Sequence, residues 1–262
     1  MHTTTLALVG ATGGAGTTRT AVELAAIGAR GGRDVAVVDA AFTTQGLSEH
    51  VSGRIGTDLT ALITDETGAS LSAATYPIGG GDDRVVGLPG RADAVPARAP
   101  FERVARAKTA EAARKLERRI DEAATAYDAV IVDAAPAGSN EAVAAVTAVD
   151  RVETVRPATA HGRDALQRLR GRIADVGGSV DGSIAVRAGV GSGRGAQGNG
   201  TIEDVDSVLP AVDPAIAAAP TAATGTGDYA RTAADAYERA FGTSLGIEFE
   251  EPGLVDRLRP SN

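Results

Sequence analysis

The sequence predicts an α/β fold with a doubly wound, mostly parallel sheet flanked by helices. Short aliphatic runs alternate with helical patterns along the first half, which is the signature of βαβ units. These runs are continuously apolar, as strands buried on both faces are. Only 3% of the 262 residues are aromatic and 43% are hydrophobic, so we expect a core of Ala, Val, Leu and Ile. Residues 1–245 are predicted to form one domain and residues 246–262 a C-terminal tail.

The first half of the chain contains three predicted strands and two predicted helices. The strands cover residues 6–9, 35–38 and 85–88. The second of them ends at Asp39, and the third stops before Pro89. A helix is predicted over 17–30, where Ala21, Leu24 and Ala25 face inward, and a shorter one over 59–63.

The second half begins with the longest predicted helix, residues 101–126. Its apolar residues are expected on one face, with mixed charges on the other: Phe101, Val104, Leu116, Ile120 and Ala123. Later strands are predicted at 129–132, 152–155 and 183–186. Later helices are predicted at 160–174 and 228–241.

Residues 189–200 are rich in glycine and contain a formal G-x-G-x-x-G at Gly193, Gly195 and Gly198. A dinucleotide-binding turn needs a strand with an acidic end about 20 residues further on, and none follows. We therefore expect a flexible surface loop here.

Composition excludes several classes of function. The chain has no Cys, which excludes disulfides and thiolate chemistry, and its three His residues lack metal-ligand spacing. The net charge of −8 argues against a protein devoted to nucleic acid. Of 26 basic residues only Lys108 and Lys115 are lysines, and neither is near the glycine-rich segment at 10–20. The N-terminal residues do not form a signal peptide and no apolar run is long enough for a membrane span, so a cytoplasmic protein is predicted.

The segment 10–20 reads Gly-Ala-Thr-Gly-Gly-Ala-Gly-Thr-Thr-Arg-Thr and joins the first strand to the first helix. Backbone N–H groups and a helix N-terminus arranged in this order can bind one anionic group. The alternative is a tight strand-to-helix turn that binds nothing.

This segment resembles the deviant Walker A motif of the ParA/MinD family of P-loop NTPases. The glycines Gly13, Gly14 and Gly16 match the loop, and Thr18 stands where a Mg²⁺-binding hydroxyl belongs. The resemblance, which covers about residues 4–242, implies a nucleotide site on the loop. Its implied residues are Gly13, Gly14, Ala15, Gly16, Thr17, Thr18 and Arg19.

The resemblance also shows what has been lost. Thr12 occupies the position of the family's signature lysine, and Thr17 occupies that of the P-loop lysine. Ala11 stands in place of the first glycine of the motif. Arg19, two residues beyond Thr17, is a candidate replacement for the missing charge, although it lies on a different side of the first helical turn.

Two aspartates complete the implied nucleotide site. Asp39 occupies the first acidic position of an Asp-x-Asp pattern whose second position is Ala41. Asp133 ends a strand that resembles Walker B, so Thr18 and Asp133 are the implied Mg²⁺ residues. The position that recognises adenine in the family is Val186, which leaves base recognition without its amide.

These losses lead to the functional prediction. Removing one preorganised donor to the reacting group costs about 2.7–4 kcal/mol in the transition state, and this sequence lacks two lysines and one aspartate. We expect a pseudo-ATPase that binds ATP or ADP with Mg²⁺ weakly, or no nucleotide, and that acts as a positioning protein together with a protein partner, such as an active ParA/MinD relative. Two alternatives stay open: a slow ATPase using Arg19 in chromosome or plasmid partitioning, and a nucleotide-free adaptor on DNA or membrane.

Two surfaces bear on the adaptor alternative. Four arginines of the 160–174 helix form a candidate site for non-specific DNA binding: Arg163, Arg168, Arg170 and Arg172. A solvated helix face is the simpler interpretation. The tail around residues 250–259 resembles the amphipathic membrane-targeting tail of MinD-like proteins, but its few apolar residues favour a frayed end.

Overall fold

The computed structural model describes residues 3–65, 68–79, 85, 87–136, 138–188 and 204–249. It contains an eight-stranded sheet in the order β3-β4-β2-β5-β1-β6-β7-β8. The strands are β1 (Thr4–Gly10), β2 (Val35–Asp39), β3 (Tyr76–Pro77), β4 (Ala92–Val95), β5 (Ala129–Ala134), β6 (Arg151–Pro157), β7 (Gly182–Val186) and β8 (Ser207–Leu209). Of these eight strands only β3 pairs in the antiparallel sense, with β4, so the predicted parallel sheet is confirmed.

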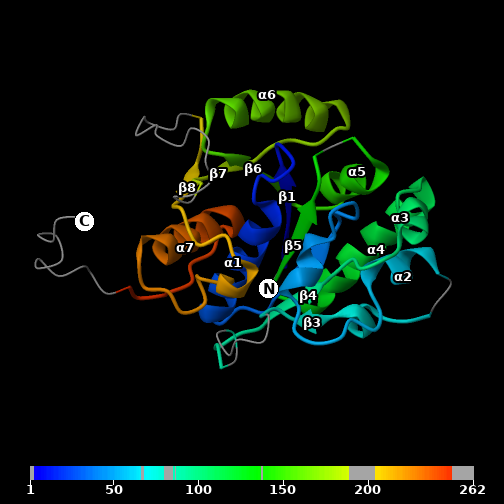
Figure 1. The fold of residues 1–262 in the computed structure, drawn as a ribbon, viewed down its shortest axis with the longest axis horizontal. Coiled ribbons are helices and arrows are strands. Elements are labelled where there is room, and N and C mark those ends of the chain that lie inside the picture. Colours follow the sequence, from blue (N-terminus) through cyan, green and yellow to red (C-terminus); the bar gives the residue numbers. More distant parts are fainter. Residues whose placement is uncertain are drawn as a thin grey trace, which may run out of the picture.

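Helices cover both faces of the sheet, which confirms the doubly wound architecture (Figure 1). The helices are α1 (Thr17–Arg30), α2 (Leu59–Thr64), α3 (Phe101–Ala107), α4 (Ala110–Ala126), α5 (Asn140–Thr147), α6 (Ala160–Asp175) and α7 (Asp228–Phe241). Helices α1 and α7 pack on one face, while α4, α5 and α6 cover the other. No helix in the described ranges is long and apolar enough to span a bilayer.

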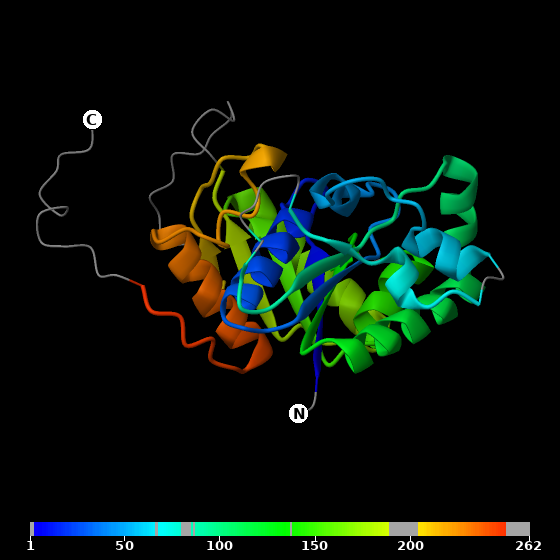
Figure 2. The same ribbon diagram turned by 90° about the horizontal axis from the view of Figure 1, so that it is seen from below.

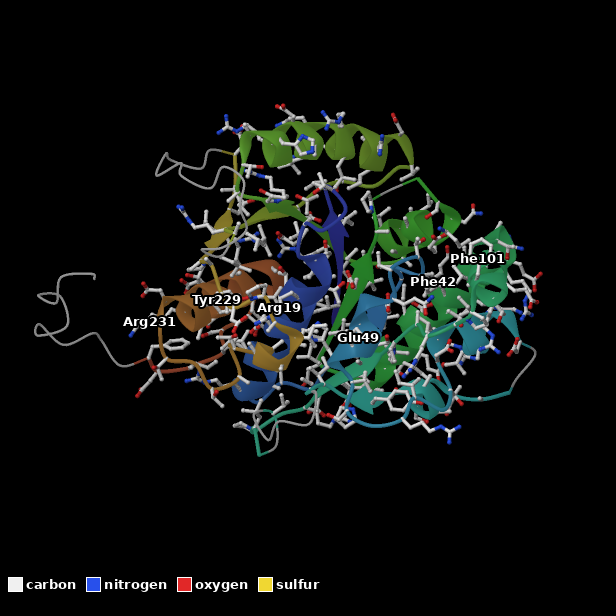
Figure 3. All side chains as sticks on the ribbon, viewed as in Figure 1. Arg19, Phe42, Glu49, Phe101, Tyr229 and Arg231 are labelled. Carbon is white, nitrogen blue, oxygen red and sulfur yellow. The ribbon has the colours of Figure 1, made fainter. Side chains whose placement is uncertain are left out.

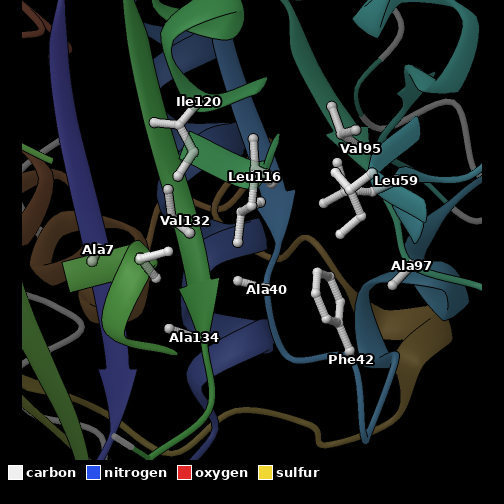
Figure 4. Packing of buried hydrophobic residues seen from close by; sticks show 14 of the residues in the cluster. Ala7, Ala40, Phe42, Leu59, Val95, Ala97, Leu116, Ile120, Val132 and Ala134 are labelled. Carbon is white, nitrogen blue, oxygen red and sulfur yellow. The ribbon is translucent and has the colours of Figure 1, made fainter. Parts of the chain in front are cut away.

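The core consists mainly of small aliphatic residues, as the composition predicts. On the α4 face, Leu116 and Ile120 lie over the central strands near Val132 (Figure 4). Phe42, which follows β2, is fully buried in the same cluster near Leu59. The central strands are therefore covered on both faces, and only their ends and the loops are open to ligands.

The predicted strand at 85–88 is wrong. Val85 and Leu88 lie outside any strand, and Gly87 adopts a left-handed turn with φ of 86°. On the side of β2 away from β5, the pairing strand is β4, further along the chain, and it contains the buried Asp93. The Tyr127 hydroxyl donates to the Asp93 carboxylate at 2.8 Å, and this distant partner makes a buried acid tolerable in a strand.

The predicted helix over 101–126 is two helices. Thr109 accepts a hydrogen bond from the Ala112 amide and caps α4, so the chain turns between α3 and α4. Phe101, expected on the buried face, is 88% exposed at the start of α3. The sequence analysis also missed α5, β3 and β8, which are short. The glycine-rich loop predicted at 189–200 lies outside the described residues, as does most of the C-terminal tail.

A test of this packing compares two glycines inside helices. A Cβ on Gly28 of α1 would lie 2.7 Å from a ring carbon of Tyr237 and 2.8 Å from a Val35 methyl. Gly28→Ala should therefore lower the free energy of unfolding by about 1–3 kcal/mol. A Cβ on Gly171 of α6 would meet nothing within 4 Å, so Gly171→Ala should raise it by up to about 1 kcal/mol. Urea denaturation of both variants measures the difference, and equal effects would contradict the packing described.

Candidate nucleotide-binding site

The loop between β1 and α1 opens onto a pocket at the carboxyl edge of the sheet. Strands β1, β5 and β2 are neighbours, and their parallel register places Asp39 beside Asp133. The pocket has a volume of about 300 Å³. Of the predicted site residues, all but Asp39 line it: Gly13, Gly14, Ala15, Gly16, Thr17, Thr18, Arg19 and Asp133.

The loop presents its backbone N–H groups to the pocket. Gly14 and Gly16 have φ values of 70° and 87°, a conformation that glycine adopts without strain. Within the described part of the chain, five consecutive or nearly consecutive amides have no hydrogen-bond acceptor: those of Gly13, Gly14, Gly16, Thr17 and Thr18. Free amides at a helix N-terminus favour an anion, so the backbone requirement for phosphate binding is met.

Thr18 and Asp133 form the polar centre of the pocket. The Thr18 hydroxyl donates to Asp133 Oδ2 at 2.6 Å, which ties the first turn of α1 to the end of β5. Asp133 is 1% exposed, and its Oδ1 has no hydrogen-bond partner among the described residues. A hydroxyl and a carboxylate are oxygen ligands of the kind that Mg²⁺ prefers, so the pair fits the implied metal.

Asp39 is fully buried next to Asp133 and accepts hydrogen bonds from the backbone. Its two carboxylate oxygens accept hydrogen bonds from the amides of Ala41 and Ala97, at 3.0 and 3.2 Å. Burial raises the pKa of Asp39, and the neighbouring charge of Asp133 raises it further. Burial also raises the pKa of Asp133, against the hydrogen bond from Thr18, which lowers it.

The positions of the missing charges hold neutral side chains. The Thr17 hydroxyl lies 2.7 Å from where a Cβ on Gly10 would sit, so it turns back toward β1. Thr12 and Ala41 line the pocket but supply no charge. Val186 of β7 lies against the loop, 3.8 Å from the Cβ position of Gly16, and offers only methyl groups at the edge expected to recognise a base.

Arg19, the candidate replacement for the P-loop lysine, is held by other groups. Its Nε pairs with Glu23 at 2.6 Å, and its terminal nitrogens donate to the Thr221 hydroxyl at 3.0 Å and to carbonyls of residues 213 and 215. Figure 3 shows Arg19 on the side toward Tyr229 of α7. In this arrangement the guanidinium anchors the segment after β8 and is not directed at the loop amides.

The sequence analysis missed Glu23 and judged Lys108 to be remote from the loop. Glu23 is fully buried in α1 and also accepts the amides of Thr221 and Ala222, at 2.9 and 2.7 Å. Lys108 Nζ donates to the Thr43 hydroxyl at 2.9 Å and pairs with Glu141 at 3.3 Å. Lys108 thereby joins the loop after β2 to α5, so a lysine does lie beside the crevice, although it does not line the pocket.

The candidate DNA surface on α6 divides into two parts. Arg168 and Arg172 are exposed one turn apart, whereas Arg163 and Arg170 are half-buried. Burial lowers the pKa of the buried Arg156 on β6, and the positive charges of Arg163 and Arg170 lower it further, against the attraction of Asp204. Two of the four predicted arginines are therefore partly covered and lie close enough to another cation to affect it.

The raised pKa values predict how stability depends on pH. Asp39 and Asp133 bind protons more tightly in the folded than in the unfolded chain, so their protonated forms stabilise the fold below the ordinary pKa of 3.8. That stabilisation is lost as pH rises through the folded pKa values toward neutral pH. Without Mg²⁺, the free energy of unfolding should fall over this range by more than about 1.4 kcal/mol, the equivalent of one pKa unit.

The variant Asp133→Asn should flatten this pH dependence, because it removes one of the two adjacent charges. Urea unfolding in a metal chelator from pH 5 to pH 8 measures the slope. Asp175→Asn, on the exposed side of α6, is the matched control. If Asp133→Asn retained the slope of the parent protein, the electrostatic description of the pocket would be wrong.

Among the comparisons with known proteins, the one with solved structures supports the fold. No family model and no curated protein matches the sequence. The septum site-determining protein MinD of Pyrococcus horikoshii, solved with Mg-ADP, is 19% identical with a TM-score of 0.71, over 91% of this chain and 94% of that chain. A singly substituted McdA of Cyanothece, solved in complex with ATP, is 18% identical with a TM-score of 0.66, over 94% of this chain and 99% of that chain.

A ParA family ATPase from Chlorobium tepidum is also similar, at 16% identity and a TM-score of 0.65, over 89% of this chain and 98% of that chain. The order of the strands, the glycine loop before α1 and the aspartate at the end of β5 occur here together. The chain therefore has the fold of the ParA/MinD-like P-loop NTPases.

Proposed function

We propose that this chain is a ParA/MinD-like protein that binds a nucleotide with Mg²⁺ weakly and does not turn it over at an appreciable rate. The observation that carries the proposal is the Thr18–Asp133 pair beside a row of free loop amides, in a pocket without a lysine. Backbone amides do not depend on side-chain identity, so phosphate binding survives the substitutions that remove catalysis.

Loss of turnover follows from the missing charges. Phosphoryl transfer depends on positioning and on neutralising charge that spreads over the transferred group. Thr12 and Thr17 supply no positive charge, Ala41 has no carboxylate to orient the attacking water, and Arg19 is committed to Glu23. Each missing donor removes about 2.7–4 kcal/mol of transition-state stabilisation, so even partly additive losses make ordinary hydrolysis too slow to serve a cycle.

The cellular role that we propose is positioning of other molecules, in partitioning or at a division site. The support is the likeness in fold to a septum site-determining protein. A site that binds without cleaving suits a partner-binding protein, and an active ParA/MinD relative is the proposed partner. Non-specific DNA binding through α6 would rest on Arg168 and Arg172, because Arg163 and Arg170 are half-buried.

Calorimetric titration of the pure protein with Mg-ADP and Mg-ATP tests the binding step. We expect a Kd in the micromolar to millimolar range and a loss of about tenfold in Thr18→Ala, because that hydroxyl is the Mg²⁺ ligand. Thr232→Ala removes a threonine hydroxyl that donates to the Asp228 carbonyl within α7, far from the loop in sequence, so it should leave the Kd unchanged. A flat trace for the parent protein would remove nucleotide from the proposal.

A restoration experiment tests the catalytic step. Phosphate release by the parent protein should equal the release by Asp133→Ala, because no catalysed reaction is there to be lost. The combined substitution Thr12→Lys, Thr17→Lys and Ala41→Asp restores the missing charges and should raise turnover at least about tenfold. Steady-state turnover by the parent protein that Asp133→Ala abolishes would refute the pseudo-ATPase assignment.

The variant Arg19→Ala distinguishes the proposed function from an ATPase that uses Arg19. Because Arg19 anchors the segment after β8, its removal should lower the free energy of unfolding by about 1–3 kcal/mol and change the nucleotide Kd by less than about threefold. Unfolding and titration on the same sample separate the two effects. A large loss of affinity with unchanged stability would instead favour an arginine-dependent ATPase.

A further inference from the structure

A second pocket lies at the opposite edge of the sheet, where the central strands begin. Its volume is about 360 Å³. In Figure 2 the dark blue strand β1 begins at this edge and runs away from it. The side chains that matter for its chemistry come from β1, from the turn after α1, from the start of β5 and from the end of α7: Thr4, Arg33, Asp128, Tyr237, Phe241 and Thr243.

Tyr237 lines this pocket and is almost fully buried as a residue. It is 1% exposed, and its hydroxyl makes no hydrogen bond to any residue that the structure describes. The ring is fixed by Phe241, at a centroid distance of 4.5 Å, and by the bare backbone of Gly28. Burial raises the pKa of Tyr237, while the charge of Arg33 lowers it and that of Asp128 raises it, so the phenol feels both charged groups of the pocket.

The guanidinium of Arg33 is a cation at the pocket with few hydrogen-bond partners among the described residues. One terminal nitrogen donates to the Thr243 hydroxyl at 2.9 Å, and no carboxylate in the described ranges pairs with the guanidinium. The remaining N–H groups and the Tyr237 hydroxyl are donors at one pocket. A carboxylate matches a guanidinium fork and accepts from a phenol, so it satisfies both groups together.

Asp128 places a negative charge on the pocket opposite the Arg33 cation in sign. It is exposed at the pocket, and one of its oxygens accepts the Asp34 amide at 2.9 Å. A ligand with two negative groups would meet repulsion there, whereas an ammonium group would be attracted. The pocket thus presents one positive and one negative side chain to a ligand of matching polarity, with two aromatic rings as its apolar wall.

We propose that this pocket binds a free amino acid or a similar small zwitterion, with its carboxylate at Arg33 and Tyr237 and its ammonium group at Asp128. The site is separate from the nucleotide pocket, and the inference does not depend on the proposed function. Both pockets touch β5, through Ala129 here and through Asp133 at the other edge.

The test is a titration of the full chain with the twenty amino acids, first by thermal shift and then by calorimetry. Acetate and ethylamine serve as carboxylate-only and amine-only probes. We expect at least one amino acid to bind with a Kd of millimolar or tighter, and to bind at least tenfold more tightly than either fragment. Saturable binding of this kind supports the site only if the variants below respond.

Tyr237→Phe removes just the unbonded hydroxyl, so it should keep the fold and weaken binding about fivefold. Arg33→Gln should weaken it at least tenfold, whereas the matched control Arg114→Gln, at an exposed position of α4, should not change it. Asp128→Asn should reduce the preference for the amino acid over acetate. If no amino acid binds, or if Tyr237→Phe and Arg33→Gln both bind like the parent protein, the proposal is overturned.

Discussion

The parallel register of β2, β5 and β1 is the constraint on which the rest of the structure depends. It brings the carboxyl ends of three strands to one edge, so that the glycine loop, Asp133 and Asp39 meet there. The hydrogen bond from Thr18 to Asp133 then fixes the first turn of α1 against β5. That turn carries two of the five free amides, those of Thr17 and Thr18, and directly follows the loop that carries the other three. One contact between distant residues therefore helps to orient the anion-binding loop.

The two acidic side chains implied by the resemblance are present at the nucleotide site, whereas the two lysine positions hold threonines. Two aspartates lie side by side with little exposure, and burial together with their mutual repulsion raises the pKa of Asp39. In a hydrolytic site a metal and lysines would balance such charges. Here the nearest cations have other contacts: Arg19 holds the segment after β8, and Lys108 joins the loop after β2 to α5. The arrangement therefore suits holding a ligand more than transforming it.

Much of the sheet could be predicted from the sequence, because β1, α1, β2 and β5 are encoded by local patterns. The strand at 85–88 was wrong because local propensity cannot show that Tyr127, 34 residues from Asp93, stabilises an acid inside β4. Phe101 was misplaced because a helical period was extended across a turn. The hydrogen bonds of Arg19 could not be predicted for the same reason, because Thr221 lies 202 residues away. The glycine-loop residues that line the pocket could be named from the sequence because their spacing is a local signal.

The most direct test of the central claim is a crystal structure of the full chain grown with Mg²⁺ and ADP. The account predicts that the phosphates accept hydrogen bonds from the amides of residues 13–18. It also predicts that the Thr18 hydroxyl turns from Asp133 to the metal, which Asp133 holds through water. A nucleotide bound elsewhere on the molecule, or a loop with no phosphate while Thr18 still donates to Asp133, would contradict it.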